Sequence, residues 1–360
     1  MKRAVRTICL CFSFVFLTSV LPCHAASPAI SASSYILIDA GSGRVLLAHN
    51  ETKELAIAST TKIMTALVAL RSAKLTDVVT VKHEHLREGS SMYLAPGETL
   101  TMEALLYGLM LPSGNDAAEC IADHCGPGTE NFVRRMNDMA AALGMTHTAF
   151  ANPSGLDEAG HHSCAQDMAR LMAYAMRDPA FVQIVSSKTA TAGTRTMANH
   201  NKLLGAVEGC IGGKTGYTGA AGRTLVTCAE RNGMRLIAVT LHDGSDWADH
   251  TALYEYGFST YCVERALSRG ESCAVAAVRG GTASYVALRA EENVFFPLTE
   301  GETLSVRFEL PDCVYAPVSL GQRIGEAVVL LDGAEVARVS LSAVRRVEEA
   351  EYRAPRFWRR

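Results

Sequence analysis

The larger, N-terminal part of the chain has alternating hydrophobic and polar positions at both of its ends. From residue 34 it reads SYILIDAGSGRVLLAHN, in which two apolar runs flank the turn-rich segment DAGSGR. This pattern predicts a β-hairpin. The segment GRTLVTCAERNGMRLIAVTLHD, residues 222–243, holds two further apolar runs joined at RNG, which is a second hairpin signal.

Between these hairpins the apolar residues recur with helical spacing. They cover more than one face of the segment that begins near Ser59, which predicts a central helix. Residues 101–125 read as two helices, because Pro112 and Gly114 interrupt the pattern at LPSGND. Further helices are predicted over residues 129–144, 163–178 and 246–259. The expected fold class is α+β, with one antiparallel sheet built from both ends of the segment and helices on both faces.

After about residue 265 the pattern changes to short apolar runs separated by Gly, Pro and Asp. Runs such as AVAAVRGG, SYVALRA, LSVRFEL and EAVVLLDG predict strands. We therefore divide the chain into a larger domain over residues 26–264, a small β-sandwich domain over 265–345 and a charged tail over 346–360. The β-rich segment contains no cluster of residues suited to catalysis.

Composition and the N-terminal segment indicate the class of protein and its cellular location. The 360 residues are 48% hydrophobic and 20% charged, as in ordinary globular proteins, and the net charge of -3 gives no reason to expect nucleic acid as a partner. The N-terminus differs, because basic MKRAVRT precedes the apolar run ICLCFSFVFLTSVLP and a small-residue site before Ala26. Residues 1–25 are predicted to be a signal peptide. Acylation of Cys23 is the alternative, although Pro22 fits it poorly. We expect export across the cytoplasmic membrane, to the cell wall or membrane surface.

Removal of residues 1–25 leaves eight cysteines. An exported protein can form disulfides, yet these cysteines are scattered and several have apolar neighbours. We expect most of them to be small buried side chains. Cys120 and Cys125 are the two close enough in sequence to suggest a local pair. No spacing of Cys and His is typical of a zinc site.

The first candidate for chemistry is a lysine among residues expected in a core. Ser59 and Lys62 lie three residues apart, so on a helix they share one face. A serine hydroxyl needs a nearby base to become a nucleophile. A buried lysine close to another positive charge can be that base, because both effects lower its pKa. Alone, the pair is weak evidence, because chance produces this spacing in most proteins of this size.

Two further segments add polar groups. Ser113, Gly114 and Asn115 form SGN between two predicted helices. The hydroxyl of Ser113 could relay a proton to a leaving amine and Asn115 could hold a substrate amide. The same segment also reads as a simple helix break with an N-cap.

The second segment, GGKTGYTGAAGR over residues 212–223, heads a predicted strand. Lys214 would add positive charge, Thr215 a hydroxyl suited to a carboxylate, and Gly216 would let a ligand approach the strand backbone. The alternative is a glycine-rich turn before a hairpin.

In this order, Ser-x-x-Lys, Ser-x-Asn and Lys-Thr-Gly are the signature of penicillin-binding proteins and class A β-lactamases. The chain resembles the D-alanyl-D-alanine carboxypeptidases, the low-molecular-weight penicillin-binding proteins. ASTTKIMTAL, GSSMYLAPGETLTMEALLYGLMLPSGNDAAE, NPSGLDEAGHHS and KTGYTGAAGRTLV are similar to blocks of that family, and the resemblance covers nearly all of residues 30–262. YAPVSLGQRIGEAVVLLDG resembles the family's C-terminal domain more loosely.

The resemblance implies acyl transfer through a covalent serine intermediate. Ser59 would attack the carbonyl between the two alanines of a peptidoglycan stem peptide ending in D-Ala-D-Ala, and Lys62 would take its proton. The N–H groups of Ser59 and Tyr217 would hold the oxyanion. Ser113 would pass a proton to the leaving D-alanine and Thr215 would bind its carboxylate. β-Lactam antibiotics should acylate the same serine, and the reaction calls for no metal or cofactor.

Some features depart from the family pattern. Ile57 stands where a proline usually precedes the first motif. The tail is short and holds Pro355 in place of a long amphipathic helix, so Phe357, Trp358 and the flanking arginines are expected to touch an anionic membrane surface weakly or to remain solvated. The sequence does not fix which basic residue assists Thr215; Arg223 is the nearest.

Three other functions remain open. A class A β-lactamase shares the motifs but also needs a glutamate that activates the deacylating water, and none of the four glutamates between Asn115 and Lys214 lies in an ExxLN setting. These are Glu119, Glu130, Glu158 and Glu208. A catalytically inert wall-binding scaffold would keep the fold, although nothing in the motifs indicates decay. An endopeptidase acting on cross-links would use the same residues.

Overall fold

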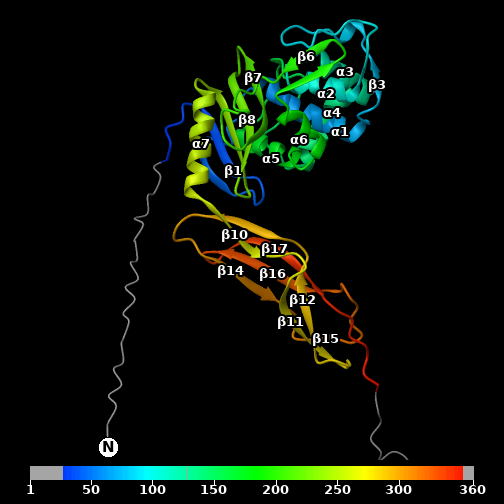
Figure 1. Cartoon of the computed structure of the whole chain (residues 1–360), viewed down its shortest axis with the longest axis vertical. Coiled ribbons are helices and arrows are strands. Elements are labelled where there is room, and N and C mark those ends of the chain that lie inside the picture. The colour runs from blue at the N-terminus through cyan, green and yellow to red at the C-terminus, as the bar shows by residue number, and fades with distance from the viewer. Residues whose placement is uncertain (1–26, 127, 352–360) are drawn as a thin grey trace, which may run out of the picture.

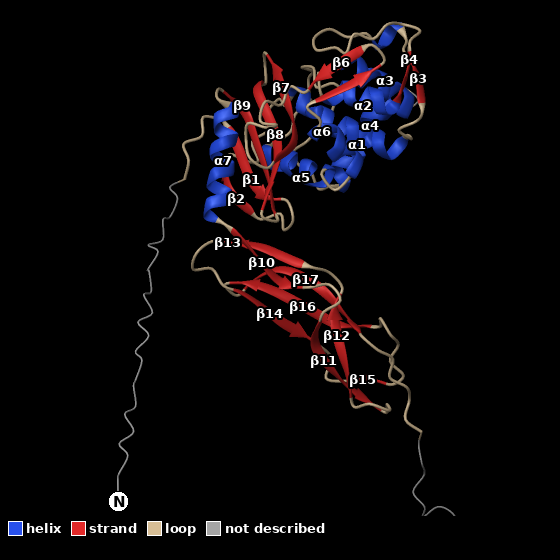
Figure 2. Ribbon diagram, viewed as in Figure 1, coloured by secondary structure: helices blue, strands red, loops and turns tan. Residues whose placement is uncertain are grey.

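The computed structural model describes residues 27–126 and 128–351. They form two modules, one with a sheet flanked by helices and one built of strands (Figures 1 and 2). The predicted signal peptide and the aromatic end of the tail lie outside the described residues. Within the described part of the chain, no helix is both long and apolar enough to span a bilayer.

A five-stranded antiparallel sheet organises the first module, in the order β2-β1-β9-β8-β7. The two predicted hairpins supply four of its strands, which confirms that the sheet joins both ends of the segment. Helix α7 packs against β9 and β8 on one face, and α5 packs against β1 and β9 on the other (Figure 1). The strands are β1 (Ser34–Asp39), β2 (Val45–His49), β7 (Cys210–Thr218), β8 (Gly222–Arg231) and β9 (Met234–Asp243), and the closing helix is α7 (Asp246–Thr260).

The remaining helices form a lobe beside the sheet, as Figure 2 shows. At its centre lies the helix predicted near Ser59, which consists of the 3₁₀ turn η1 (Ala58–Thr61) followed by α1 (Lys62–Ser72). Every residue from Lys62 to Ala69 is buried, as expected for a helix with apolar residues all round. The other helices are α2 (Met102–Met110), α3 (Asn115–Cys125), α4 (Thr129–Ala142), α5 (Ala165–Ala175) and α6 (Pro179–Ser186).

Several short elements lack a clear sequence pattern and were not predicted. They include two small antiparallel strand pairs that border the helical lobe and a 3₁₀ turn. Strands of three or four residues offer too few alternating positions to reveal a period. These elements are β3 (Val78–Thr80) with β4 (Thr99–Thr101), β5 (Thr189–Ala192) with β6 (Arg195–Ala198), and η2 (His83–His85).

The second module is all β, as predicted, with its own apolar core. A six-stranded sheet in the order β14-β16-β17-β12-β11-β15 accompanies the pair β10-β13. The predicted division after residue 264 falls within β10. The strands are β10 (Cys262–Leu267), β11 (Ser272–Arg279), β12 (Tyr285–Ala290), β13 (Val294–Leu298), β14 (Leu304–Glu309), β15 (Val314–Tyr315), β16 (Arg323–Leu331) and β17 (Ala334–Ala343).

All eight cysteines within residues 27–126 and 128–351 are free. Cys120 and Cys125 do not pair, because five residues along α3 turn their side chains about 140° apart. Both are buried among apolar residues, as expected for most of the cysteines.

Arg44, in the turn between β1 and β2, connects the two modules. Its guanidinium forms a bidentate ion pair with Glu302 and donates to the carbonyl of Pro297. It also lies over the rings of Tyr261 and Phe296, at 5.2 and 5.5 Å from their centroids. The side chains of Arg44 and Glu302 are only 16% and 19% exposed, so water screens the pair poorly.

We predict that Arg44→Ala lowers the free energy of unfolding by about 1–3 kcal/mol, between the values for exposed and fully buried pairs. The hydrogen bonds from Arg44 hold the pKa of Glu302 below the usual value for a glutamate. The stabilisation by the ion pair is therefore complete above that usual value and is lost as the pH falls through the lower folded pKa. Thermal unfolding at pH 7 and at pH 3 should therefore separate wild type from variant more at pH 7. Glu302→Gln is the matched variant, and equal stability of all three proteins at pH 7 would contradict the prediction.

Candidate active site

The structure brings Ser59 and Lys62 together. Ser59 lies in η1 and Lys62 is the first residue of α1, with the amine 2.9 Å from the Ser59 hydroxyl. The turn is strained, because Ala58 has a φ of +47°, a left-handed conformation that is costly for a residue with a side chain. Strain of this kind persists where surrounding contacts enforce it, and it is frequent at functional sites.

Lys62 is fully buried and three oxygen atoms surround its amine. Nζ lies 2.9 Å from Ser59 Oγ, 2.7 Å from Asn115 Oδ1 and 2.6 Å from the carbonyl oxygen of Ser154. Burial, and then the nearby charge of Lys214, lower the pKa of Lys62 well below its usual 10.5. A neutral amine has two N–H donors and one lone pair. Asn115 and Ser154 can accept the two N–H bonds, which leaves the lone pair directed at the Ser59 hydroxyl.

Asn115 begins α3, and its carboxamide is engaged within the protein. Its Oδ1 accepts from Lys62 and its Nδ2 donates to the carbonyl of Glu88 at 2.7 Å. Its backbone N–H donates to the carbonyl of Ser90. The structure thus gives Asn115 a part in positioning Lys62, and its predicted contact with a substrate amide stays a prediction.

Ser113 occupies the turn between α2 and α3. Its φ is +67°, and its hydroxyl is buried with no hydrogen-bond partner among the residues that the structure describes. A buried hydroxyl without a partner costs about 1–3 kcal/mol, so such groups are rare and often functional. Ser113 and Ser59 line the same cavity, which agrees with the relay that the sequence suggested.

Lys214, Thr215, Gly216 and Tyr217 lie on β7, the edge strand of the sheet. A Cβ on Gly216 would lie 2.3 Å from Thr224 Oγ1 and 3.0 Å from the backbone nitrogen of Ser59. The glycine that was expected to admit a ligand is thus required first by the chain itself, because it lets β7 approach the Ser59 turn.

The two side chains before Gly216 differ in environment. Lys214 is buried, its amine donates to the carbonyl of Thr215 at 2.8 Å, and burial lowers its pKa to about 7. Thr215 is half-buried and lines the cavity. Tyr217, in contrast, is 71% exposed at the cavity rim.

The cavity has a volume of about 490 Å³ and opens over the Ser59 hydroxyl. Five of the predicted residues line it, and so does Arg223, the basic residue nearest in sequence to Thr215. Sequence reasoning missed the other lining residues, which carry no motif of their own. The missed residues are Ser90, Asn199, His200, Lys202, Asp246 and Trp247. The lining, within the described residues, contains no glutamate.

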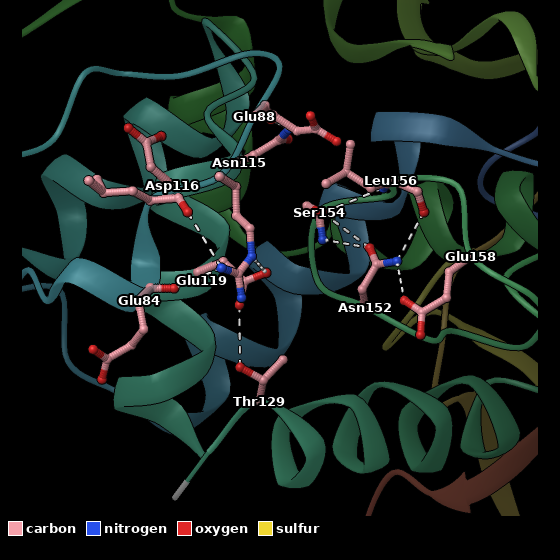
Figure 3. Close-up of polar contacts among 12 residues, drawn as sticks. Glu84, Glu88, Asn115, Asp116, Glu119, Thr129, Asn152, Ser154, Leu156 and Glu158 are labelled. Carbon is pink, nitrogen blue, oxygen red and sulfur yellow. Dashed lines mark hydrogen bonds and ion pairs between the residues drawn. The ribbon is translucent and has the colours of Figure 1, made fainter. Parts of the chain in front are cut away.

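The Ser154 carbonyl is held by the side chain of Asn152, which the sequence did not single out. Its Oδ1 accepts from the Ser154 N–H, the Ser154 hydroxyl and the Gly155 N–H. Its Nδ2 donates to the carbonyl of Leu156 at 3.0 Å and to Glu158 Oε2 at 2.9 Å. Figure 3 shows Asn152 between Ser154 and Glu158. One carboxamide therefore fixes a whole turn, as asparagine commonly does.

Two further contacts fix this turn against η1. A Cβ on Gly155 would lie 2.0 Å from the carbonyl oxygen of Ala58, so the two segments touch backbone to backbone. His161 Nδ1 accepts from the Ala151 N–H, and its Nε2 lies 2.7 Å from Thr61 Oγ1. Burial lowers the pKa of His161 to about 4, so the ring stays neutral and its Nε2–H donates to Thr61.

Asp116 fixes the opposite side of the cavity. Its carboxylate accepts from the backbone N–H groups of Met92 and Leu94 and from the hydroxyl of Ser91. These bonds hold the segment that carries Ser90 into the cavity. Within residues 27–126 and 128–351 no group of three or more His, Cys, Asp or Glu side chains could hold a metal ion.

Known proteins resemble this chain in sequence and in fold. A family model described as D-alanyl-D-alanine carboxypeptidase matches residues 22–245, and one described as penicillin-binding protein 5, C-terminal domain, matches residues 263–349. The D-alanyl-D-alanine carboxypeptidase DacF of Bacillus subtilis is 31% identical over 89% of this chain and 87% of its own length. DacA of Haemophilus influenzae is 34% identical over 90% of this chain and 87% of its own.

Among solved structures, penicillin-binding protein 5 of Haemophilus influenzae superposes with a TM-score of 0.79. It is 31% identical, and the match covers 90% of this chain and 99% of the other. Both modules thus have counterparts in one known protein, in the same order.

We predict that Asn152→Ala slows acylation of Ser59 by fluorescent penicillin about 10- to 100-fold, the effect expected when a reacting group moves by about 1 Å. Asn152→Asp keeps the acceptor oxygen for the Ser154 turn and should lose less. Asn293→Ala is the matched control, because Asn293 accepts a backbone N–H of Arg269 in the second module. Labelling rates and unfolding temperatures are measured together, and an Asn152→Ala protein with the wild-type rate would exclude the positioning role.

Proposed function

The chain belongs to the D-alanyl-D-alanine carboxypeptidase family, and on that premise we propose which residues carry out each step. It is a serine-type D-Ala-D-Ala carboxypeptidase and a penicillin-binding protein, and the β-lactamase and inert-scaffold alternatives are not favoured. The family implies a peptidoglycan stem peptide as substrate and β-lactams as ligands.

Ser59 is the nucleophile and Lys62 the base. The observation that carries this assignment is the buried amine 2.9 Å from the hydroxyl, with its other bonds taken by Asn115 and Ser154. Because the pKa of Lys62 is lowered, a neutral amine is available to accept the serine proton as Ser59 attacks the carbonyl. The new C–O bond gives a tetrahedral intermediate, which collapses to the acyl-enzyme as the C–N bond breaks.

The oxyanion is placed between the N–H groups of Ser59 and Tyr217. β7 is an edge strand that lies against the Ser59 turn at Gly216, which supports this placement. Outward-facing N–H groups of an edge strand are free for a ligand. Each oxyanion donor is typically worth about 10²–10³ in rate.

Ser113 transfers the proton to the departing D-alanine, for which its unpartnered hydroxyl in the cavity is suited. Lys214 contributes positive charge when protonated, and Thr215 binds the terminal carboxylate. Water then releases the acyl group from Ser59. The absence of glutamate from the described cavity lining supports slow release of a penicillin adduct.

The role in peptidoglycan maturation and the location outside the cytoplasmic membrane are part of the same proposal. They follow from the substrate and from the predicted signal peptide in residues 1–25. Weak membrane contact by the arginines and aromatic residues of the tail is proposed on the sequence pattern alone. An endopeptidase activity would use the same residues, and cross-linked muropeptides are the substrate that tests for it.

We predict that Ser59→Ala abolishes both labelling by penicillin and release of D-alanine from an N-acylated tripeptide ending in D-Ala-D-Ala, because the acyl-enzyme can no longer form. Mass spectrometry of the penicillin-treated wild type should place the adduct on the peptide that contains Ser59. An adduct on another residue, or labelling of the alanine variant, would identify a different nucleophile.

For Lys62→Arg we predict loss of acylation by at least about 10³-fold with the fold retained, because arginine keeps its proton and cannot act as a base. In the wild type the acylation rate should rise with pH as Lys62 loses its proton, with a midpoint well below 10.5. Stopped-flow acylation between pH 5 and 10 measures both. An Arg variant that acylates normally would remove Lys62 from this role.

A further inference from the structure

The cavity contains three side chains that could oppose the negative charge of a substrate carboxylate: His200, Lys202 and Arg223. Arg223, the residue suggested by the sequence, is already engaged. Its Nε and terminal nitrogen each lie 2.9 Å from the carboxylate of Asp246, and its guanidinium lies over the ring of Trp247. It pairs in register with Tyr217, two positions beyond Thr215 on β7. Arg223 is therefore neutralised and displaced from the predicted carboxylate site.

His200 combines a fixed backbone with an exposed side chain. The Asn199 carboxamide donates to the carbonyls of Val185 and Ser187 and accepts from the Asn201 N–H. Asn201 is buried, and its Oδ1 accepts from the Leu203 N–H at 3.1 Å. The histidine thus lies between two anchored asparagines, with its ring free at the cavity. A rigid backbone that presents one polar side chain to a cavity is typical of a recognition position.

Two observations locate His200 between the Ser113 turn and β7. Its backbone N–H donates to the carbonyl of Leu111 at 3.2 Å, two residues before Ser113. Its side chain also lines the same cavity as Thr215 and Gly216 of β7. His200 therefore borders the part of the cavity where the leaving D-alanine, with its terminal carboxylate, lies in the proposed mechanism.

We propose that His200 is the specificity-determining residue that binds the terminal carboxylate of the substrate, so that a titratable side chain, in place of a permanent cation, sets the affinity of this enzyme. The proposal rests on the proposed function, which supplies the orientation of the peptide. The group recognised is the free carboxylate of a C-terminal D-amino acid, and the carboxylate of a penicillin presents the same chemistry.

The sign of the pH dependence follows from the charges around the ring. Partial burial and the charge of Lys214 lower the pKa of His200 below 6.5 in the free enzyme. A bound carboxylate favours the protonated ring and raises that pKa, so binding is tightest at acidic pH and weakens as the pH rises. Lys202 faces the same cavity, and Asp246 is already paired with Arg223.

A rise in pH has opposite effects on turnover and on binding. Acylation needs the neutral amine of Lys62, so kcat rises with pH. Binding weakens over the same range, so KM rises as well. Lys214, whose pKa is lowered to about 7, is a second group that could make KM depend on pH. Variants of His200 separate the two causes, because they remove one titration and leave the other.

The test measures kcat and KM between pH 5 and 8.5 for an N-acylated tripeptide ending in D-Ala-D-Ala. The wild type should show KM rising with pH. His200→Arg should lower KM at pH 8.5 by about tenfold, the effect of one charge-assisted hydrogen bond, and should flatten the profile. His200→Gln should be flat at the high KM. Lys202→Gln should bind more weakly at every pH while it keeps the wild-type slope.

A second substrate provides the control. The same tripeptide with an amidated terminus lacks the carboxylate, so wild type and His200→Arg should show the same KM for it at every pH. A pH-dependent KM that survives in His200→Gln would assign the effect to Lys214 and overturn the proposal. So would a His200→Arg variant that gains equally on both substrates.

The outcome stays separate from the proposed function. Unfolding temperatures report on the fold of the His200 variants, and covalent labelling of the wild type by penicillin tests the enzyme assignment. Failure of the wild type to label at all would refute the enzyme assignment, whereas normal labelling with an unchanged KM profile in His200→Gln would refute only the role of His200.

Discussion

The structure of the site depends on keeping one amine, that of Lys62, buried without a permanent charge. Removing an ammonium group from water is costly, so the protein meets the cost by lowering the pKa and by surrounding the amine with acceptors. The three oxygen atoms around the amine come from three separate segments: the η1 turn, the start of α3 and the turn at Ser154. Each segment is held by polar contacts of its own, so the position of the amine requires much of the helical lobe to be in place.

These supports explain why strained backbone and an unpartnered hydroxyl occur beside an otherwise well-packed core. Ala58 and Ser113 both adopt left-handed backbone conformations, which typically cost about 1–3 kcal/mol each. Ser113 also buries a hydroxyl that finds no partner in the described part of the chain. At these two residues the backbone conformation is one that alanine and serine rarely adopt, because the turns position groups of the site. Such departures from local preference are common at functional sites.

The sequence predicted the elements whose physical signal is periodic. Both hairpins, the fully buried helix from Lys62 and the β-rich second module have clear alternation or helical spacing, and each is present. The motif residues could also be found, because their side chains carry the chemistry. The carbonyl of Ser154 could not, since every residue has a carbonyl and only the turn made by Asn152 directs this one at Lys62.

Other contacts escaped prediction because they join residues far apart in the chain. In the sequence, Arg44 is an ordinary turn residue, and only the fold brings Glu302 beside it. His200 lies in a loop that carries no motif, although it lines the cavity. Arg223 shows the same limit, because it is the basic residue nearest to Thr215 in sequence, yet the fold pairs its guanidinium with Asp246. Sequence patterns report on periodic burial and local chemistry, whereas a binding site also depends on which charges are already paired.

The two buried lysines, Lys62 and Lys214, have different protonation states that depend on each other. Lys62 can act as a base only while it is neutral, and the positive charge of Lys214 is one of the causes that keep it so. Lys214 in turn has a pKa of about 7 because of its burial, so near neutral pH it carries a charge part of the time. Two ammonium groups in one poorly solvated site repel each other, which favours the state with a lone pair beside Ser59 and the charge beside Thr215. In the proposed mechanism, that state has the base where the serine proton leaves and the positive charge where the carboxylate and the oxyanion would lie. If the protonation states were exchanged, Lys62 would be charged and could not act as a base, and Lys214 would be neutral and could not supply positive charge.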